Sequence, residues 1–122
     1  MTLDECMARV DRMKPSAFPP EEKAAWLLGL EQQMVEGFYP RYVEVGPIGP
    51  SSYPEDRDVP LRASGPWEEL YVHYLGAMVD YHHQDTDAYN DAMSLFSAAS
   101  DEYRKHYHRT HTPRSSGGFQ NL

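Results

Sequence analysis

Cysteine is almost absent from this 122-residue chain, which contains only Cys6. One thiol cannot form an internal disulfide, and a cysteine-based zinc site needs several, so both are excluded and a reducing compartment is favoured. Cys6 falls on the apolar stripe of the first expected helix. We therefore interpret it as a small buried hydrophobic residue and not as a nucleophile.

Long apolar runs are absent as well. No stretch approaches the ~20 apolar residues of a membrane span, and residues 1–5 lack the basic segment and apolar core of a secretion signal. We expect a soluble protein that is made in the cytoplasm and has no membrane partner. Neither a Gly-x-Ser-x-Gly turn nor a phosphate-binding loop occurs, so the motifs indicate no catalytic residue and no cofactor.

Basic residues are scarce, because 11 Lys and Arg stand against 19 Asp and Glu and the formal net charge is -8. Nucleic-acid binding depends on Lys and Arg that displace counterions from phosphates, so neither general nor sequence-specific binding is expected. The charge is unevenly distributed: residues 1–103 carry all 19 acids, whereas residues 104–122 carry four basic residues and no acid. Two surfaces of opposite charge favour contacts between subunits.

Helix signals dominate what is present. Residues 2–5 form a capping-box pattern, and Pro20 and Pro66 suit the first turn of a helix. These signals predict an all-α fold in a single domain, residues 1–113, followed by a disordered tail, residues 114–122. The four expected helices cover residues 2–14, 20–37, 66–83 and 86–109.

The last two expected helices are joined by only a few residues near position 85, which predicts an antiparallel hairpin. Facing residues must then lie at equal distances from the turn, and apolar residues match in four layers. The predicted pairs are Trp67 with Tyr103, Tyr71 with Ala99, Leu75 with Phe96, and Met78 with Met93. The predicted hairpin core consists of Trp67, Tyr71, Leu75, Met78, Met93, Phe96 and Tyr103.

Residues 40–65 are expected to form a long proline-rich loop between the second and third helices. Its prolines prevent a continuous strand, although residues 42–45 and 59–61 could pair as a short β-hairpin. Long irregular segments are commonly functional, and tyrosine suits an interface because its ring is apolar and its hydroxyl polar. The candidate interface residues are Tyr39, Tyr42 and Tyr53, in or beside this loop, with Arg104 and Arg109 from the basic end.

Histidine is abundant, with six residues, and imidazole is a common metal ligand. His82 and His83 lie at the turn of the hairpin, whereas His106, His108 and His111 lie at the other end of the last helix. The two groups therefore cannot form one site. Solvated or interfacial imidazoles are the simpler interpretation, and we predict no metal site. A metal-dependent enzyme that uses His106, His108 and His111 is a less favoured alternative.

Six segments of the chain share packing and capping patterns that include no catalytic signature. They are residues 10–15 (VDRMKP), 22–27 (EKAAWL), 59–61 (VPL), 66–80 (PWEELYVHYLGAMVD), 89–96 (YNDAMSLF) and 107–113 (YHRTHTP). Together these segments resemble a group of small phage and prophage proteins of Gram-positive bacteria, which are usually encoded among virion structural genes. The resemblance extends over most of residues 8–113, and residues 114–122 have no counterpart in it.

The resemblance implies a non-enzymatic protein of the virion neck, similar to the helical head-to-tail connector or head-completion proteins that bind below the portal ring. Such proteins act as rings of identical copies. The implied partners are therefore further copies of this chain, the portal and other neck or tail proteins, and the implied locations are the bacterial cytoplasm during assembly and then the virion. The alternative is a small phage or host adaptor or regulatory protein that binds one partner through residues 40–65.

Overall fold

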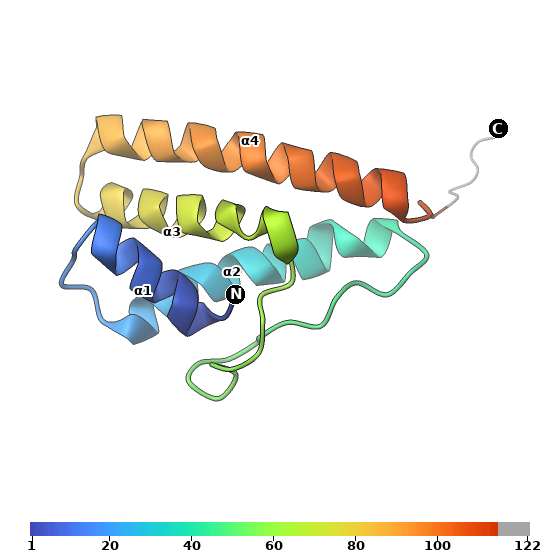
Figure 1. Ribbon diagram of the computed structural model, residues 1–122, viewed down its shortest axis with the longest axis horizontal. Coiled ribbons are helices and arrows are strands. Elements are labelled where there is room, and N and C mark those ends of the chain that lie inside the picture. Colours follow the sequence, from blue (N-terminus) through green and yellow to red (C-terminus); the bar gives the residue numbers. More distant parts are fainter. Residues whose placement is uncertain (115–122) are drawn as a thin grey trace.

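The computed structural model describes residues 1–114 and contains helices but no strand within that range. The predicted all-α fold is confirmed (Figure 1). No helix within residues 1–114 is both long and apolar enough to cross a membrane. The long helices are α1 (Leu3–Met13), α2 (Pro20–Gly37), α3 (Glu69–His82) and α4 (Thr86–Thr110), and the short 3-10 helices are η1 (Tyr39–Arg41) and η2 (Gly65–Trp67).

Local capping chemistry sets two of the helix starts. At α1, the Thr2 hydroxyl accepts the Glu5 backbone N–H at 3.2 Å and the Glu5 carboxylate accepts the Thr2 N–H at 2.9 Å, which is the predicted capping box. At α4, the Asp85 side chain accepts the Ala88 N–H at 3.2 Å. Gln84 has a φ of +61° and closes the turn between α3 and α4.

Helix α3 is the central helix of the molecule. Helix α4 runs antiparallel along one side of α3, and α1 and α2 contact α3 from other sides (Figure 1). Eight of the 14 residues of α3 are buried, including Asp80, which pairs with Lys14 of the segment that follows α1. Only three of the 25 residues of α4 are buried, because this helix has a partner on one side only.

Ring contacts across the hairpin bear on two of the predicted pairs. Trp67 and Tyr103 are in contact as predicted, and the Phe96 ring meets Tyr74, the residue before its predicted partner Leu75. Leu75 is fully buried in the interior of the molecule. The aromatic pairs across the hairpin, by distance between ring centroids, are Trp67 with Tyr103 at 6.0 Å, Tyr74 with Phe96 at 5.1 Å and Tyr81 with Tyr89 at 5.5 Å.

Three of the predicted core residues are buried, and the other four are less buried than predicted. Tyr71, Leu75 and Tyr103 are buried. Trp67, Met78, Met93 and Phe96 are only half-buried, because the outer helix α4 leaves one side of the hairpin in contact with solvent. Cys6 is fully buried, and burial raises the pKa of its thiol to about 12, in agreement with its interpretation as a small hydrophobic residue.

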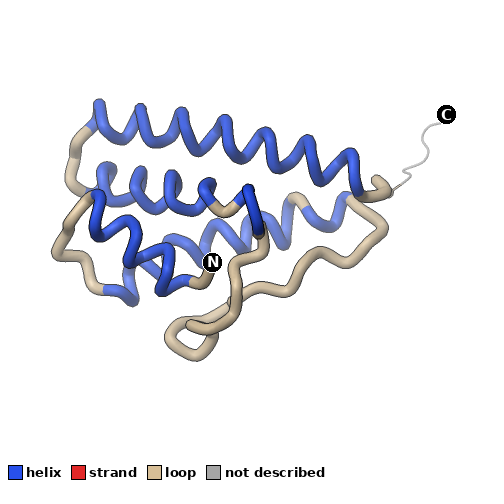
Figure 2. Tube along the Cα trace, in the orientation of Figure 1, coloured by secondary structure: helices blue, strands red, loops and turns tan. Residues whose placement is uncertain are grey.

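The segment between η1 and η2 is an irregular loop that returns along the molecule from the end of α2 to the start of α3 (Figure 2). The β-hairpin considered from the sequence is absent, since residues 42–45 do not pair with residues 59–61. Within residues 1–114 the structure contains one isolated antiparallel bridge, between Tyr42 and Pro113. The Val43 N–H donates to the Thr112 carbonyl at 2.8 Å beside it.

The boundary predicted for the tail also needs correction. The Arg114 backbone N–H donates to the Arg41 carbonyl at 2.8 Å, and the Arg114 Nε donates to the Pro40 carbonyl at 2.7 Å. Arg114 is therefore part of the folded domain. The remainder of the predicted disordered tail, residues 115–122, lies outside the described residues.

Candidate interaction surface

An aromatic cluster joins the end of α2 to the end of α4. The Tyr39 and Tyr103 hydroxyls lie 2.7 Å apart, and burial raises the pKa of Tyr103 to about 12. The Tyr42 ring packs edge-on against Phe38 and Tyr107, with centroids 5.4 and 4.9 Å away and interplanar angles of 66° and 72°. Tyr39 and Tyr42 are only 5% and 4% exposed. The sequence predicts these two tyrosines at a contact with another subunit, but the structure buries them in the chain's own core.

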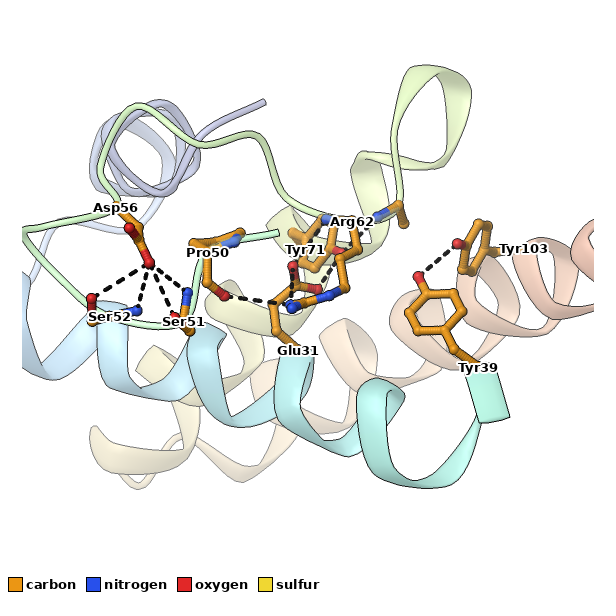
Figure 3. A network of polar contacts seen from close by, with 10 residues as sticks. Glu31, Tyr39, Pro50, Ser51, Ser52, Asp56, Arg62, Tyr71 and Tyr103 are labelled. Carbon is orange, nitrogen blue, oxygen red and sulfur yellow. Dashed lines mark hydrogen bonds and ion pairs between the residues drawn. The ribbon is translucent and has the colours of Figure 1, made fainter. Parts of the chain in front are cut away.

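A buried carboxylate fastens the far end of the loop to α2 and α3 (Figure 3). Glu31 of α2 is 1% exposed and accepts the Tyr71 hydroxyl at 2.6 Å and the Arg62 backbone N–H at 2.9 Å. The Arg62 guanidinium lies 3.3 Å from the same carboxylate, and the Ala63 N–H donates to the Tyr71 oxygen at 2.9 Å. Burial raises the pKa of Glu31, although these donors act in the opposite direction. We call Glu31, Arg62 and Tyr71 the loop clamp.

The middle of the loop is held against α1. The Tyr53 hydroxyl and the Arg57 Nε both donate to Asp4, each at 2.8 Å, and these two bonds lower the pKa of the Asp4 carboxyl. Asp56 accepts backbone N–H groups of Ser51 and Ser52 at 2.9 and 3.2 Å (Figure 3). The third predicted interface tyrosine, Tyr53, is therefore half-buried and serves as an anchor of the loop.

One part of the loop presents aliphatic side chains to solvent. Val43 is 57% exposed, Val45 94% and Ile48 89%. Anchors hold this segment on both sides, since Val43 bonds to Thr112 and Pro50 is buried. Sequence reasoning included these residues in the contact loop 40–65 but singled out only its tyrosines. The available signal was the presence of aliphatic residues between prolines without the periodicity of a helix or strand.

A basic cavity lies next to this segment, at the end of α4. Its volume is about 330 Å³, and the residues that line it include no carboxylate. The Arg104 guanidinium lies 5.2 Å from the centre of the Phe38 ring. The structure thus brings the predicted interface residues Arg104 and Arg109 together with Arg41, which the sequence did not suggest. The lining residues are Phe38, Arg41, Tyr42, Arg104, Lys105, His108 and Arg109.

These cations have almost no carboxylate partners within the described residues, a property that they share with Arg12 and Arg114. Within residues 1–114, Arg41, Arg104 and Arg109 form no ion pair, and Lys105 only approaches Glu102 at 4.0 Å. Most other basic groups have a carboxylate partner. The pairs are the N-terminus with Glu68, Arg9 with Glu69, Lys14 with Asp80, Lys23 with Asp11, Arg57 with Asp4, and Arg62 with Glu31.

Tyr42 connects the basic cavity to the aliphatic segment. It lines the basic cavity and also a second cavity of about 390 Å³ that Val45 and Ile48 border. The two features are therefore continuous around one buried tyrosine. We call this region the Tyr42 surface; its basic half is Arg41, Arg104, Lys105 and Arg109, and its aliphatic half is Val43, Val45 and Ile48.

The histidines near this end have separate partners. The His106 ring lies 4.9 Å from Trp67, His108 Nδ1 is 3.3 Å from the Tyr42 hydroxyl, and His111 stacks on Tyr107 with centroids 3.6 Å apart. Among residues 1–114 the structure contains no group of three or more His, Cys, Asp or Glu side chains that could hold a metal ion. His106, His108 and His111 therefore do not form a three-residue group of this kind within that range.

Comparison of the chain with protein-family models, with curated proteins and with solved structures gives no match. The geometry of its own residues therefore defines the class of site. That class is a preformed surface in which a basic cavity adjoins an exposed aliphatic segment.

Proposed function

We propose that this chain is a non-enzymatic structural protein of a phage or prophage, a head-to-tail connector or head-completion component that works through protein–protein contacts. The observation that carries the proposal is the Tyr42 surface. It joins unpaired cations to aliphatic side chains that are more than half exposed, and contact surfaces between proteins combine these features. The resemblance of most of residues 8–113 to virion structural proteins is the reason for proposing a phage or prophage protein.

The proposed partners are further copies of the chain in a ring, the portal and neighbouring neck or tail proteins. The opposite charges of the two parts of the chain support such contacts, because a ring requires two different complementary surfaces on each subunit. Assembly would take place in the bacterial cytoplasm, and the protein would then remain in the virion. An adaptor that binds a single partner is the second candidate, and the concentration of the exposed features at one end of α4 favours it.

Deletion of the gene from the phage or prophage genome tests the proposal. We expect DNA-filled heads without attached tails in electron micrographs and a loss of infectious particles. A plasmid copy of the wild-type gene should restore tailed particles, a copy with Ile48→Ser and Arg104→Glu should not, and a copy with Leu95→Ser should. Leu95 is a matched control because it is 55% exposed but lies outside the Tyr42 surface.

Normal tailed particles after the deletion would contradict the connector role. In that case, co-purification of the tagged chain with one regulatory or host protein, outside any virion, would establish the adaptor.

A further inference from the structure

The basic half of the Tyr42 surface has almost no acidic partner within residues 1–114. The chain carries 19 acids and 11 bases, so a carboxylate partner for every cation could have been provided within the fold. Most basic groups outside this surface have one, whereas Arg41, Arg104 and Arg109, like Arg12 and Arg114 elsewhere, form no ion pair within residues 1–114; only the first three share one cavity. No acid lines the cavity that they share. Like charges gathered without a counter-charge repel one another, and an external anion removes that repulsion.

The aliphatic half identifies the kind of anion. Val45 and Ile48 are 94% and 89% exposed and are continuous with the basic half through Tyr42. Burial of these side chains against another apolar surface is favourable, and a phosphate backbone provides no such surface. A protein segment can provide both a carboxylate and an aliphatic side chain. The combination therefore favours protein over nucleic acid as the partner.

The surface is also held in place before any partner binds. On one side, Val43 bonds to Thr112, and on the other side Arg62 is held by the buried Glu31. Pro47 and Pro50 restrict the backbone between these anchors. Because the segment is already ordered, binding involves a smaller loss of conformational entropy than binding by a free loop.

From these three observations we infer that the Tyr42 surface binds an acidic, aliphatic segment of another protein, with carboxylates in the basic cavity and aliphatic side chains against Val45 and Ile48. The inference rests on the proposed function for the idea that the chain works by protein contacts, and it adds the chemistry of the partner.

Fluorescence anisotropy with purified protein tests the inference. The probe is a labelled peptide of about 12 residues in which Glu and Leu alternate, and it is compared with a Glu and Ser peptide, a Lys and Leu peptide and single-stranded DNA of about the same length. We expect the Glu and Leu peptide to bind at least about tenfold more tightly than the other three probes.

Variants of the protein separate the two halves of the surface. Arg104→Glu and Ile48→Ser should each weaken the binding of the Glu and Leu peptide by about tenfold. Arg12→Glu on α1 and Leu95→Ser on α4 are matched controls, since both side chains are exposed outside the Tyr42 surface, and they should leave binding unchanged. Circular dichroism confirms that each variant is folded.

The inference is overturned if the Glu and Leu peptide does not bind, if the Glu and Ser peptide binds equally well, or if DNA binds as tightly and without sensitivity to Ile48→Ser. Self-association that Arg104→Glu abolishes, without any peptide binding, would overturn it in favour of a second copy as the occupant. If the Glu and Leu peptide does not bind but gene deletion gives tailless particles, only the docking surface is contradicted. If the peptide binds but gene deletion leaves normal virions, only the connector role is contradicted.

Discussion

Glu31 is a carboxylate that is almost completely buried. A carboxylate at 1% exposure loses the solvation that water gives its charge, and three donors from Arg62 and Tyr71 replace that water. Tyr71 has two roles, because its hydroxyl also accepts the Ala63 N–H. The free energy of unfolding therefore depends on every hydrogen bond of the loop clamp, since a buried polar atom that loses its partner destabilises the folded protein.

Tyr71→Phe tests this dependence with a minimal change of shape. The substitution removes a donor from Glu31 and an acceptor from the Ala63 N–H, so we expect the free energy of unfolding to fall by about 1–3 kcal/mol. Urea denaturation measures the change. Tyr81→Phe is the matched control because Tyr81 is 59% exposed, and surface substitutions of this kind usually change stability by less than about 0.5 kcal/mol. Equal effects of the two substitutions would show that the clamp hydrogen bonds add nothing to stability.

At the scale of elements, the loop is a folded part of the molecule. Residues 43–64 have neither helix nor strand, but they bond to α1 through Asp4, to α2 through Glu31 and to the end of the described chain through Thr112. Close packing accompanies these bonds. A Cβ atom on Gly49 would lie 2.6 Å from Arg62 Cγ and 2.8 Å from a Glu31 carboxylate oxygen.

Gly49→Ala should therefore destabilise the protein. The added methyl group must displace the Arg62 side chain or the Glu31 carboxylate, and overpacking of this kind costs about 1–3 kcal/mol. Gly29→Ala provides an opposite control within α2, because a Cβ there meets nothing within 4 Å and Ala is a better helix former by about 1 kcal/mol. Thermal melting followed by circular dichroism should move in opposite directions for the two variants. A higher melting temperature for Gly49→Ala would contradict the tight packing of the loop.

At the scale of the whole molecule, charge is separated along α4. This helix has 25 residues and is about 37 Å long at ~1.5 Å per residue. Asp85, Asp87 and Asp91 lie at its start, and Arg104 and Arg109 lie at its end. Asp87 in the first turn and Arg109 in the last turn complement the adjacent ends of the helix dipole, which explains part of the pattern. The dipole does not explain why no carboxylate lines the basic cavity, and this lining supports the proposed external partner.

The carboxylates also predict how stability depends on pH. Hydrogen bonds from Arg57, from backbone N–H groups and from Arg9 lower the pKa values of Asp4, Glu44, Asp56 and Glu69. The stability that these four groups contribute is present above their ordinary pKa values of 3.8 and 4.5 and is lost as the pH falls through the lower folded values. We expect the free energy of unfolding, measured by urea denaturation, to decrease as the pH falls from about 4 to about 2.

Glu31 has the opposite sign and provides an internal control. Its pKa is raised by burial, so its contribution is present below its ordinary value of 4.5 and is lost as the pH rises through the folded value. The wild type should therefore gain stability relative to Glu31→Gln as the pH falls toward 4.5 from above. A difference between the two proteins that stays constant with pH would show that Glu31 keeps an ordinary pKa in the folded state.

The four helices could be predicted from the sequence by itself, because capping, proline placement and helical periodicity act between residues close together in the chain. Thr2 with Glu5 is such a case, and so is the short turn after α3. The basic residues in the last turns of α4 could also be identified from the sequence. Their surroundings could not, since Arg41 reaches the same cavity from the end of α2.

Only the tertiary structure decided which residues are exposed. Tyr42 pairs with Pro113, Glu31 meets Arg62 and Tyr71, and each contact joins positions that are distant in sequence. Long-range packing buries Tyr39 and Tyr42, which the sequence assigned to an interface, half-buries Tyr53 and leaves Val45 and Ile48 in solvent. Exposure is a property of the packed assembly of helices, because α3 is enclosed by the other three while α4 is covered on one side, and no local pattern records that arrangement.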